Sequence, residues 1–230
     1  MDQQQDIIEY AKLMTELERR RKMNKLAQYR PYPKQKEFHD AGYNHRERLL
    51  MASNQSGKTY CGAAELAIHL TGRYPDWWKG RVFNKPIRAW ASSKTGFVTR
   101  DGPQRMLVGE PKEREAWGSG LIPGECIERT ILKHGIMDAL DGMVIKHESG
   151  DFSTIGYKSY DQGREPWQAE TLDVLWLDEE PPMDVYMEGL TRTNATDGMV
   201  YLTFTPLLGV SEVVRMFLEA DRAESESNAA

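Results

Sequence analysis

The feature that most constrains the fold of this chain is a polar loop that ends an apolar run and opens a helix of small residues. Residues 49–59 read LLMASNQSGKT. They follow the pattern G-x-x-x-x-G-K-[ST], except that Ala52 stands in the place of the first glycine. A phosphate-binding loop of this kind needs a strand before it and a helix after it. The segment therefore predicts a strand, a P-loop and a helix in direct succession.

Each part of the loop suits a nucleotide phosphate. Gly57 has no Cβ and lets the backbone approach phosphate oxygens, while loop N–H groups and the positive end of the following helix attract an anion. Lys58 is expected on the β- and γ-phosphates, and the Thr59 hydroxyl is a candidate Mg²⁺ ligand. An ordinary turn is the alternative, because a bare Gly-Lys-Thr is common. The expected nucleotide-binding residues are Ala52, Ser53, Asn54, Gln55, Ser56, Gly57, Lys58 and Thr59.

Composition narrows the class of protein. Hydrophobic residues make up 40% and charged residues 28% of 230, which is ordinary for a soluble globular protein. The sequence has no apolar run of the ~20 residues that a membrane span needs, and residues 1–6 do not resemble a secretory signal. Two cysteines give neither a disulfide framework nor a metal spacing, and fit a reducing cytoplasm. The net charge of −5 argues against a wholly basic nucleic-acid surface but allows a local patch.

Alternating strands and helices predict an α/β fold of the P-loop NTPase (ASCE, RecA-like) class, with a mainly parallel central sheet flanked by helices. Strands are expected at 48–52, 87–91, 172–177 and 199–204, helices at 59–70 and 211–218, a strand pair at 143–147 and 152–158, and a loop at 109–124. The expected divisions are an N-terminal helix in 1–29, an ATPase domain over 30–219 and a disordered tail at 220–230. A basic run at 19–22 could touch DNA or an acidic partner; a solvated helix face is the favoured alternative.

A second motif follows the most apolar strand. Residues 174–177 lead into Asp178 and Glu179, at the carboxyl end of a strand, which is where ligands bind in open α/β sheets. Asp178 is placed to hold Mg²⁺, directly or through its water shell. The Glu179 side chain is expected on the opposite side of the strand from Asp178, because side chains alternate along a strand. Glu179 is therefore a candidate base for the attacking water. An acidic turn at a strand end is the alternative. Together with the P-loop, the pair predicts NTP hydrolysis.

Two further polar features accompany these motifs. Gln35 lies just upstream of the P-loop strand, and its amide offers both a donor and an acceptor to an adenine edge. Residues 203–206 read TFTP at another strand end, where a hydroxyl could sense the γ-phosphate. Thr205 is the preferred coupling hydroxyl. Taken alone, Gln35 would be interpreted as a surface glutamine and residues 203–206 as an ordinary turn.

Taken in order, these residues resemble the ATPase domain of the large terminase subunit of tailed bacteriophages, the motor that packages double-stranded DNA. That family has an adenine-contacting glutamine, an altered P-loop, a strand ending in Asp-Glu and a coupling motif similar to Thr-Thr-Pro. The likeness covers roughly residues 30–218. The runs that look like the branch of short-tailed, headful-packaging phages are 70–75, 178–182, 188–194 and 203–207.

The resemblance implies ATP and Mg²⁺ as cofactors, with Lys58 and Glu179 in catalysis and Thr59 and Asp178 at the metal. It also implies double-stranded DNA, the portal protein of the procapsid and the small terminase subunit as partners. A homo-oligomeric ring on the portal, no membrane association and a location in the host cytoplasm follow from the same likeness.

The sequence departs from the family in two respects. Asn54 stands where many members carry an arginine proposed as a finger in cis, and an amide lacks a full positive charge. The family also has an arginine upstream of the Asp-Glu strand, proposed to act in trans. Arg164 is the matching candidate here, with a surface salt bridge as its alternative role. The nuclease domain of large terminases is not expected in this chain, so we do not assign DNA cleavage to it.

Two other functions remain open at this stage. A helicase-like DNA-dependent ATPase would share the same motifs but normally needs a second RecA-like domain. A nucleotide-binding regulatory module without turnover would not need both Lys58 and Glu179.

Overall fold

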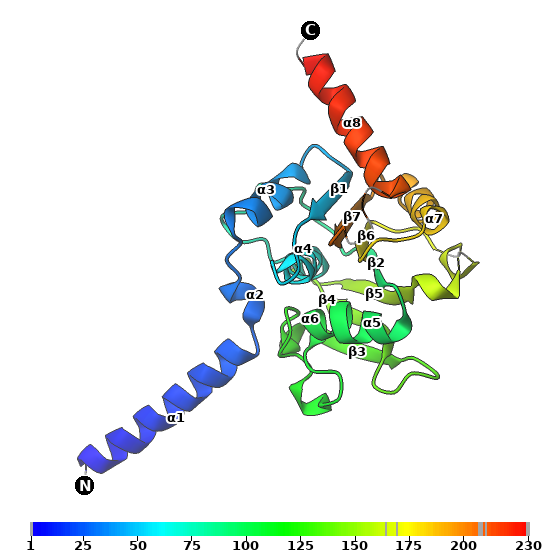
Figure 1. The fold of residues 1–230 in the computed structure, drawn as a ribbon. Helices are drawn as coiled ribbons and strands as arrows, with labels where there is room; N and C mark the ends of the chain where they lie inside the picture. The colour runs from blue at the N-terminus through cyan, green and yellow to red at the C-terminus, as the bar shows by residue number, and fades with distance from the viewer. Residues whose placement is uncertain (1, 164, 169, 207–208, 210, 229–230) are drawn as a thin grey trace.

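The computed structural model describes residues 2–228 except 164, 169, 207–208 and 210 (Figure 1). The helices are α1 (Asp2–Lys22), α2 (Lys25–Gln28), α3 (Pro33–Ala41), α4 (Lys58–Thr71), α5 (Gly96–Thr99), α6 (Arg105–Val108), α7 (Met183–Asn194) and α8 (Glu212–Asn228). The strands are β1 (Glu47–Met51), β2 (Arg88–Ser93), β3 (Ile127–Leu132), β4 (Leu140–Lys146), β5 (Phe152–Ser159), β6 (Val174–Asp178) and β7 (Met199–Phe204).

The described strands form one sheet in the order β1-β7-β6-β2-β5-β4-β3. The five strands from β1 to β5 in this order run parallel, whereas β4 and β3 are antiparallel additions at the far edge. The predicted α/β class with a mainly parallel sheet is therefore confirmed. Strand β7 lies between the P-loop strand β1 and the acidic strand β6, so the three predicted strand-end motifs emerge side by side.

Helices cover both faces of the sheet, and the alternation of side chains along each central strand divides the core in two. On β6, Val174 and Trp176 join the cluster under α4, while Leu175 and Leu177 join the cluster under α7 and α8. Every residue of β6 and β7 is buried. This is why both segments are continuously apolar instead of alternating.

The P-loop helix α4 packs tightly on the sheet because Gly62 has no side chain. A Cβ at Gly62 would lie 2.6 Å from Nε1 of Trp176, and the Tyr201 hydroxyl donates to the Gly62 carbonyl at 2.8 Å. Gly72 ends the helix at φ +70°, as expected of a glycine C-cap.

Several boundaries differ from the expectations. The helix expected within 1–29 is broken into α1 and α2 at residues 23–24, where Asn24 accepts from the Ala27 N–H and caps α2. Strand β3 and helix α7 were not predicted. Strand β3 exposes most of its side chains on the sheet edge. Residues 220–228, expected to be disordered, continue α8 as helix. Alanine, glutamate and arginine there are good helix formers.

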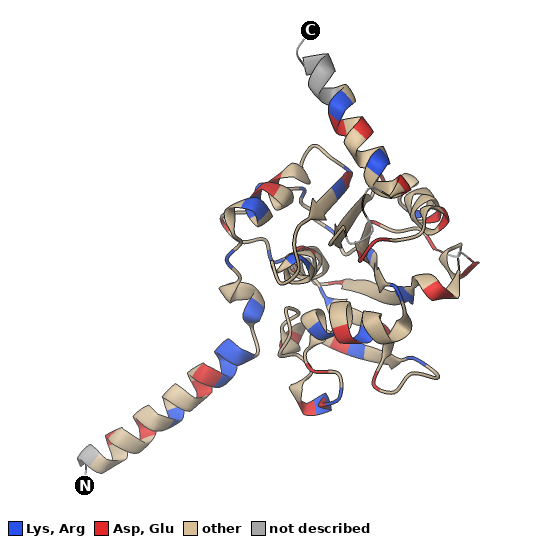
Figure 2. Cartoon of the chain, viewed as in Figure 1, with Lys and Arg blue, Asp and Glu red and all other residues tan. Residues whose placement is uncertain are grey.

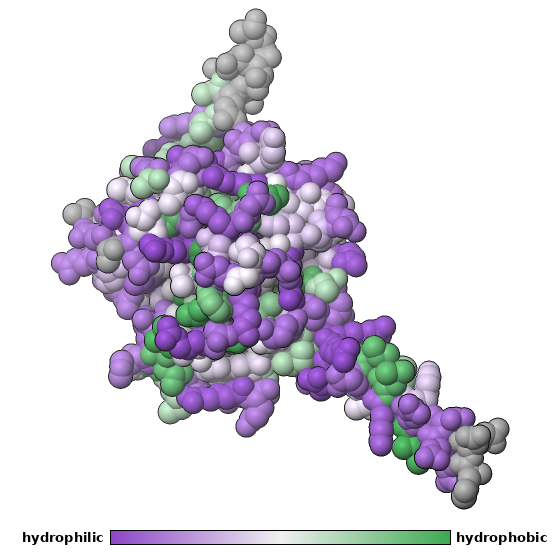
Figure 3. All heavy atoms as spheres, turned by 180° about the vertical axis from the view of Figure 1, so that it is seen from behind, coloured by the Kyte–Doolittle hydropathy of each residue, from purple (hydrophilic) through white to green (hydrophobic). Residues whose placement is uncertain are grey.

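Helices α1 and α8 extend away from the sheet domain in different directions (Figure 1). The basic run 19–22 lies at the end of α1 (Figure 2). Its residues are exposed, and Arg19 and Arg20 both pair with Glu16 on the same helix. Apolar side chains are exposed along α1, including Ile7 at 67% and Tyr10 at 66% (Figure 3). No helix within the described residues combines the length and apolar character required to cross a bilayer.

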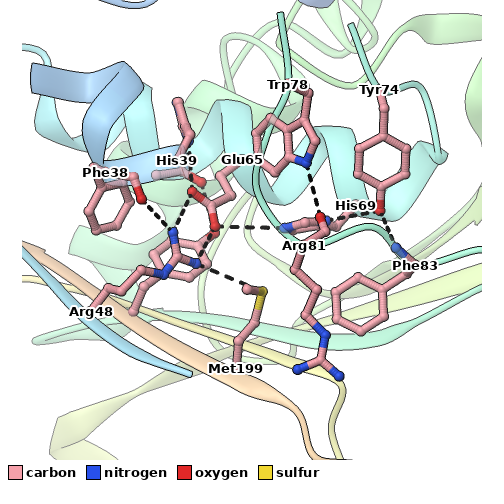
Figure 4. A network of polar contacts seen from close by, with 12 residues as sticks. Phe38, His39, Arg48, Glu65, His69, Tyr74, Trp78, Arg81, Phe83 and Met199 are labelled. Carbon is pink, nitrogen blue, oxygen red and sulfur yellow. Dashed lines mark hydrogen bonds and ion pairs between the residues drawn. The ribbon is translucent and has the colours of Figure 1, made fainter. Parts of the chain in front are cut away.

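A buried ionic cluster joins α4 to β1 and α3 (Figure 4). Glu65 on α4 is completely buried and pairs with Arg48 of β1 through both carboxylate oxygens. Its Oε2 also lies 2.7 Å from Nδ1 of His39 on α3. His69 Nε2 is 3.6 Å from Glu65 Oε1, which is ion-pair range but too long for a hydrogen bond. The Arg48 guanidinium also lies 4.8 Å from the centroid of the Phe38 ring.

Opposing effects set the ionisation of this cluster. Burial alone would raise the pKa of Glu65, but the Arg48 guanidinium and the contact with His39 hold it well below its usual range. Burial lowers the pKa of His69 and thereby favours its neutral form. Glu65 is therefore a carboxylate that compensates the buried charge of Arg48.

Replacing Glu65 by glutamine should strongly destabilise the chain. Glu65→Gln leaves Arg48 buried without its counter-charge, which typically costs about 3–5 kcal/mol of unfolding free energy. Because the folded-state pKa of Glu65 is depressed, its contribution is present above the unfolded pKa near 4.5 and is lost as the pH falls through the folded value. Urea denaturation at pH 7 and at lower pH measures both effects.

Glu37→Gln is the matched control, because Glu37 pairs with Lys34 at the surface, where such pairs contribute about 0–1 kcal/mol. Equal losses for the two variants at pH 7 would contradict the role given to Glu65.

Candidate functional site

The candidate site lies at the carboxyl ends of β1, β6 and β7, where the P-loop meets the acidic strand end. The loop itself is held in an unusual backbone conformation. Gln55 and Gly57 both have positive φ, at 60° and 77°. A side chain at Gly57 would be strained by that conformation and would also lie 3.1 Å from Nε2 of Gln35. The backbone geometry by itself therefore favours glycine at position 57.

Two side chains of the P-loop, Lys58 and Ser56, are bonded within the loop. The Lys58 ammonium donates to the Ser53 carbonyl at 2.8 Å, and the Ser56 hydroxyl donates to the same oxygen at 2.8 Å. Lys58 is only 9% exposed. The loop therefore places a largely buried positive charge at the start of α4, where the helix dipole also favours an anion.

Asp178 is the point where the two main motifs meet. Its Oδ1 accepts hydrogen bonds from the Thr59 hydroxyl at 3.0 Å and from the Thr203 hydroxyl at 2.8 Å. The Trp176 indole N–H in turn donates to the Thr203 hydroxyl oxygen at 2.8 Å. Three elements far apart in the sequence, α4, β6 and β7, are thus joined at one carboxylate oxygen.

The environment of Asp178 is suited to a cation. The side chain is 4% exposed, and burial raises its pKa to about 7, against the opposing effect of the two hydroxyl donors. Its Oδ2 faces Gly102, where an added Cβ would lie 3.5 Å away. The glycine leaves room beside that oxygen.

The donor set fits Mg²⁺, which prefers hard oxygen ligands and keeps several waters while using only one or two carboxylates. Thr59 and Asp178 are the residues that would hold it. No group of three or more His, Cys, Asp or Glu side chains within the described part of the chain could hold a metal, so phosphate and water oxygens would have to complete the shell.

Glu179 directly follows Asp178 and has a left-handed backbone, with φ of 67°. Its N–H donates to the Thr203 carbonyl at 2.9 Å, and the Tyr160 hydroxyl contacts its carbonyl oxygen at 2.9 Å. Its Oε2 is 3.9 Å from the ammonium of Lys94. Glu179 is therefore a partly exposed carboxylate on a tightly held turn beside Asp178.

The remaining predicted residues contact the P-loop. The Thr205 hydroxyl donates to Oδ1 of Asn54 at 2.9 Å, which connects the end of β7 to the loop. Gln35 Nε2 donates to the Gly57 carbonyl at 3.2 Å, and Gln35 Oε1 accepts from the Tyr32 N–H at 3.0 Å. Gln35 thus lies beside the P-loop as its upstream position suggested. Its role toward an adenine stays a prediction.

Sequence patterns did not single out every residue of the site. Arg164 lies outside the described residues, so its role stays a prediction. Tyr160 and Lys94 were not predicted, because neither belongs to a recognisable motif. Thr203 was noted beside Thr205, but only the structure separates them: Thr203 contacts Asp178, and Thr205 contacts Asn54.

The sequence was compared with those of known protein families and proteins. A family model described as "Terminase large subunit, T4likevirus-type, N-terminal" matches residues 49–229. The chain is 41% identical over 229 residues to the large terminase subunit of Salmonella phage P22, covering 92% of this chain and 46% of that protein. It is 27% identical over 235 residues to the large terminase subunit of Enterobacteria phage LP7, covering 92% and 47%.

The fold has a solved counterpart. The crystal structure of the HK97 bacteriophage large terminase superposes with a TM-score of 0.56 at 15% identity, over 86% of this chain and 38% of that one. This likeness concerns the fold alone. The chain spans about half the length of the curated relatives that it matches.

The raised pKa of Asp178 predicts a pH-dependent cost of folding in metal-free and nucleotide-free buffer. Between about pH 4 and 7 the unfolded chain loses this proton before the folded chain does, so stability falls as the pH rises and is constant above that window. Asp178→Asn keeps an oxygen acceptor for Thr59 and Thr203 but carries no charge. We expect its advantage in unfolding free energy over wild type to grow across the window, at roughly 1.4 kcal/mol per pH unit as an upper bound.

Urea denaturation between pH 4 and 8 measures this difference. Asp161→Asn, which removes an exposed carboxylate just after β5, controls for the loss of one negative charge. If the advantage of Asp178→Asn in unfolding free energy were independent of pH, burial would not raise the pKa of Asp178.

Proposed function

The chain belongs to the large terminase subunit family, and from this premise we propose that it hydrolyses ATP with Mg²⁺ to drive double-stranded DNA into a procapsid. The observation that carries the proposal is the 3.0 Å hydrogen bond between Thr59 and Asp178. It places the P-loop hydroxyl at the carboxylate of the acidic strand end, so that phosphate-binding and metal-binding groups share one site. Glu179 supplies a base one residue further on.

The residues have distinct tasks in this reaction. Lys58 exchanges the Ser53 carbonyl for phosphate oxygens when ATP binds, and the loop N–H groups bind the rest of the phosphate chain. Thr59 and Asp178 hold Mg²⁺, which when bound offsets negative charge on the phosphates. Glu179 orients the attacking water and accepts its proton. Gln35, beside Gly57, is the proposed adenine contact.

A finger residue would add a second positive charge beside that of Lys58 in the transition state. This second charge requires a source outside the P-loop. Asn54 stands where the loop could carry an arginine, and it has no charge. Its side chain instead accepts a hydrogen bond from Thr205. We assign the finger role to Arg164, acting in trans between neighbours of a ring on the portal. A finger of this type typically contributes ~10³–10⁵ in rate. The proposal therefore expects slow hydrolysis by the isolated chain and faster hydrolysis in the assembled ring.

The partners proposed for the whole protein are double-stranded DNA, the portal protein of the procapsid and the small terminase subunit, in the host cytoplasm. Stimulation of the ATPase by empty procapsids together with DNA distinguishes a packaging motor from a free-standing ATPase. DNA alone would suffice for a helicase-like enzyme.

Lys58→Ala should abolish Mg²⁺-dependent ATP hydrolysis, because no other described residue places an ammonium within the P-loop. Phosphate release under single-turnover conditions, with protein in excess over ATP, detects even slow hydrolysis. Lys79→Ala removes an exposed lysine from a loop outside the site and should retain the wild-type rate. Turnover that persists in Lys58→Ala would remove the basis for a phosphate-binding loop.

Glu179→Gln should bind ATP with near wild-type affinity yet hydrolyse it about 10²–10⁴-fold more slowly, the usual contribution of a general base. Fluorescent-nucleotide titration and single-turnover hydrolysis give the two readings. Glu180→Gln, at the next position, controls for the loss of a neighbouring carboxylate and should hydrolyse ATP at the wild-type rate. If Glu179→Gln instead loses ATP binding, Glu179 is structural.

A further inference from the structure

Tyr160 makes a contact with the acidic strand end that none of the sequence motifs anticipates. It follows directly after β5, and its hydroxyl lies 3.0 Å from the Asp178 carbonyl oxygen and 2.9 Å from the Glu179 carbonyl oxygen. The single hydroxyl hydrogen is therefore shared between two successive carbonyls. The two carbonyls belong to the residues that we assign to the metal and to the base.

The turn that Tyr160 contacts is under backbone strain. Glu179 adopts a φ of 67°, a left-handed conformation that is uncommon for residues other than glycine and that costs energy unless the surroundings maintain it. On one side the Glu179 N–H donates to the Thr203 carbonyl at 2.9 Å. On the other side the Tyr160 hydroxyl holds the carbonyl. The peptide groups around Glu179 are thus fixed from two different elements.

Tyr160 is itself rigidly placed. The residue is 6% exposed, and its ring lies 6.2 Å, centroid to centroid, from that of Trp167. Trp167 is fully buried and packs edge-on against Trp90 of β2, at 5.6 Å. The hydroxyl therefore acts from a fixed aromatic cluster under the sheet face opposite α4.

We propose that Tyr160 is a positioning residue for Glu179, whose hydroxyl keeps the strand-end turn in the conformation that aims the Glu179 carboxylate at the attacking water. Tyr160 touches neither ATP nor the water, and it acts only through the backbone of Glu179. This inference rests on the proposed ATP hydrolysis. It adds a residue whose loss should slow the chemical step without weakening nucleotide binding, because the P-loop contacts do not involve it.

The test compares two single-atom deletions on the same stretch of chain. Tyr160→Phe removes the bridging hydroxyl and keeps the ring. Tyr157→Phe on β5 is the matched control, because Tyr157 is 1% exposed and its hydroxyl has no hydrogen-bond partner in the described part of the chain. Both variants remove a buried tyrosine hydroxyl, but only one removes a contact with the Glu179 turn.

We expect Tyr160→Phe to slow single-turnover hydrolysis by roughly 10–100-fold, the range that follows when a catalytic group is misplaced by about 1 Å. Its ATP affinity should stay within about twofold of wild type, and Tyr157→Phe should match wild type in both readings. In a Glu179→Gln background, Tyr160→Phe should cause no further loss of rate, because there is no base left to position.

All rates are measured well below the melting temperature of each variant, so that a stability loss does not enter the comparison. Three results would each overturn the positioning role while leaving the proposed function intact. Tyr160→Phe could hydrolyse ATP at the wild-type rate, or it could lose ATP affinity alongside the rate. It could also cause a further rate loss in the Glu179→Gln background. A wild-type chain that shows no Mg²⁺-dependent hydrolysis, even with procapsids and DNA, would overturn the proposed function and this inference together.

Discussion

The architecture of the site depends on one carboxylate oxygen that accepts hydrogen bonds from two hydroxyls on different elements. Oδ1 of Asp178 receives Thr59 from α4 and Thr203 from β7, so a single buried atom sets the spacing between the P-loop helix and the two central strands. Such charge-assisted hydrogen bonds are stronger than neutral ones, and burial makes any unpaired polar group there costly. The P-loop hydroxyl and the acidic strand end are therefore held together by contacts that belong to the protein core.

The middle of α4 is fixed by a buried ion pair. The Glu65 carboxylate binds Arg48 of β1 and His39 of α3, while Gln35 on the same face of α3 reaches the Gly57 carbonyl. Helix α3 is thus attached to the start of α4, at the end of the P-loop, and again about two turns further along. Because breaking a buried pair leaves an uncompensated charge, these contacts resist any sliding of the P-loop helix relative to β1.

Sequence patterns were informative wherever local chemistry dictates structure. The P-loop, the apolar strand ending in Asp178 and the strand ending at Phe204 could be predicted, because burial on both faces produces continuous apolar runs. The short edge strand β3 exposes most of its side chains and carries no such pattern.

Long-range contacts carry no local signature. Nothing near Tyr160 in the sequence shows that its hydroxyl meets Glu179. Similarly, nothing in the sequence shows that Trp176 is the residue packed against Gly62. The Glu65–Arg48 pair was missed for the same reason, since a charged residue within a helix usually faces solvent.

The polar groups of the P-loop have partners both within the loop and outside it. Lys58 and Ser56 both bond the Ser53 carbonyl, and Asn54 accepts from Thr205 at the end of β7. A phosphate that draws Lys58 away leaves Ser53 with one fewer donor, so the loop has to adjust next to Asn54. The Asn54–Thr205 hydrogen bond joins the loop to the residue that follows β7, so such an adjustment would also bear on the end of that strand.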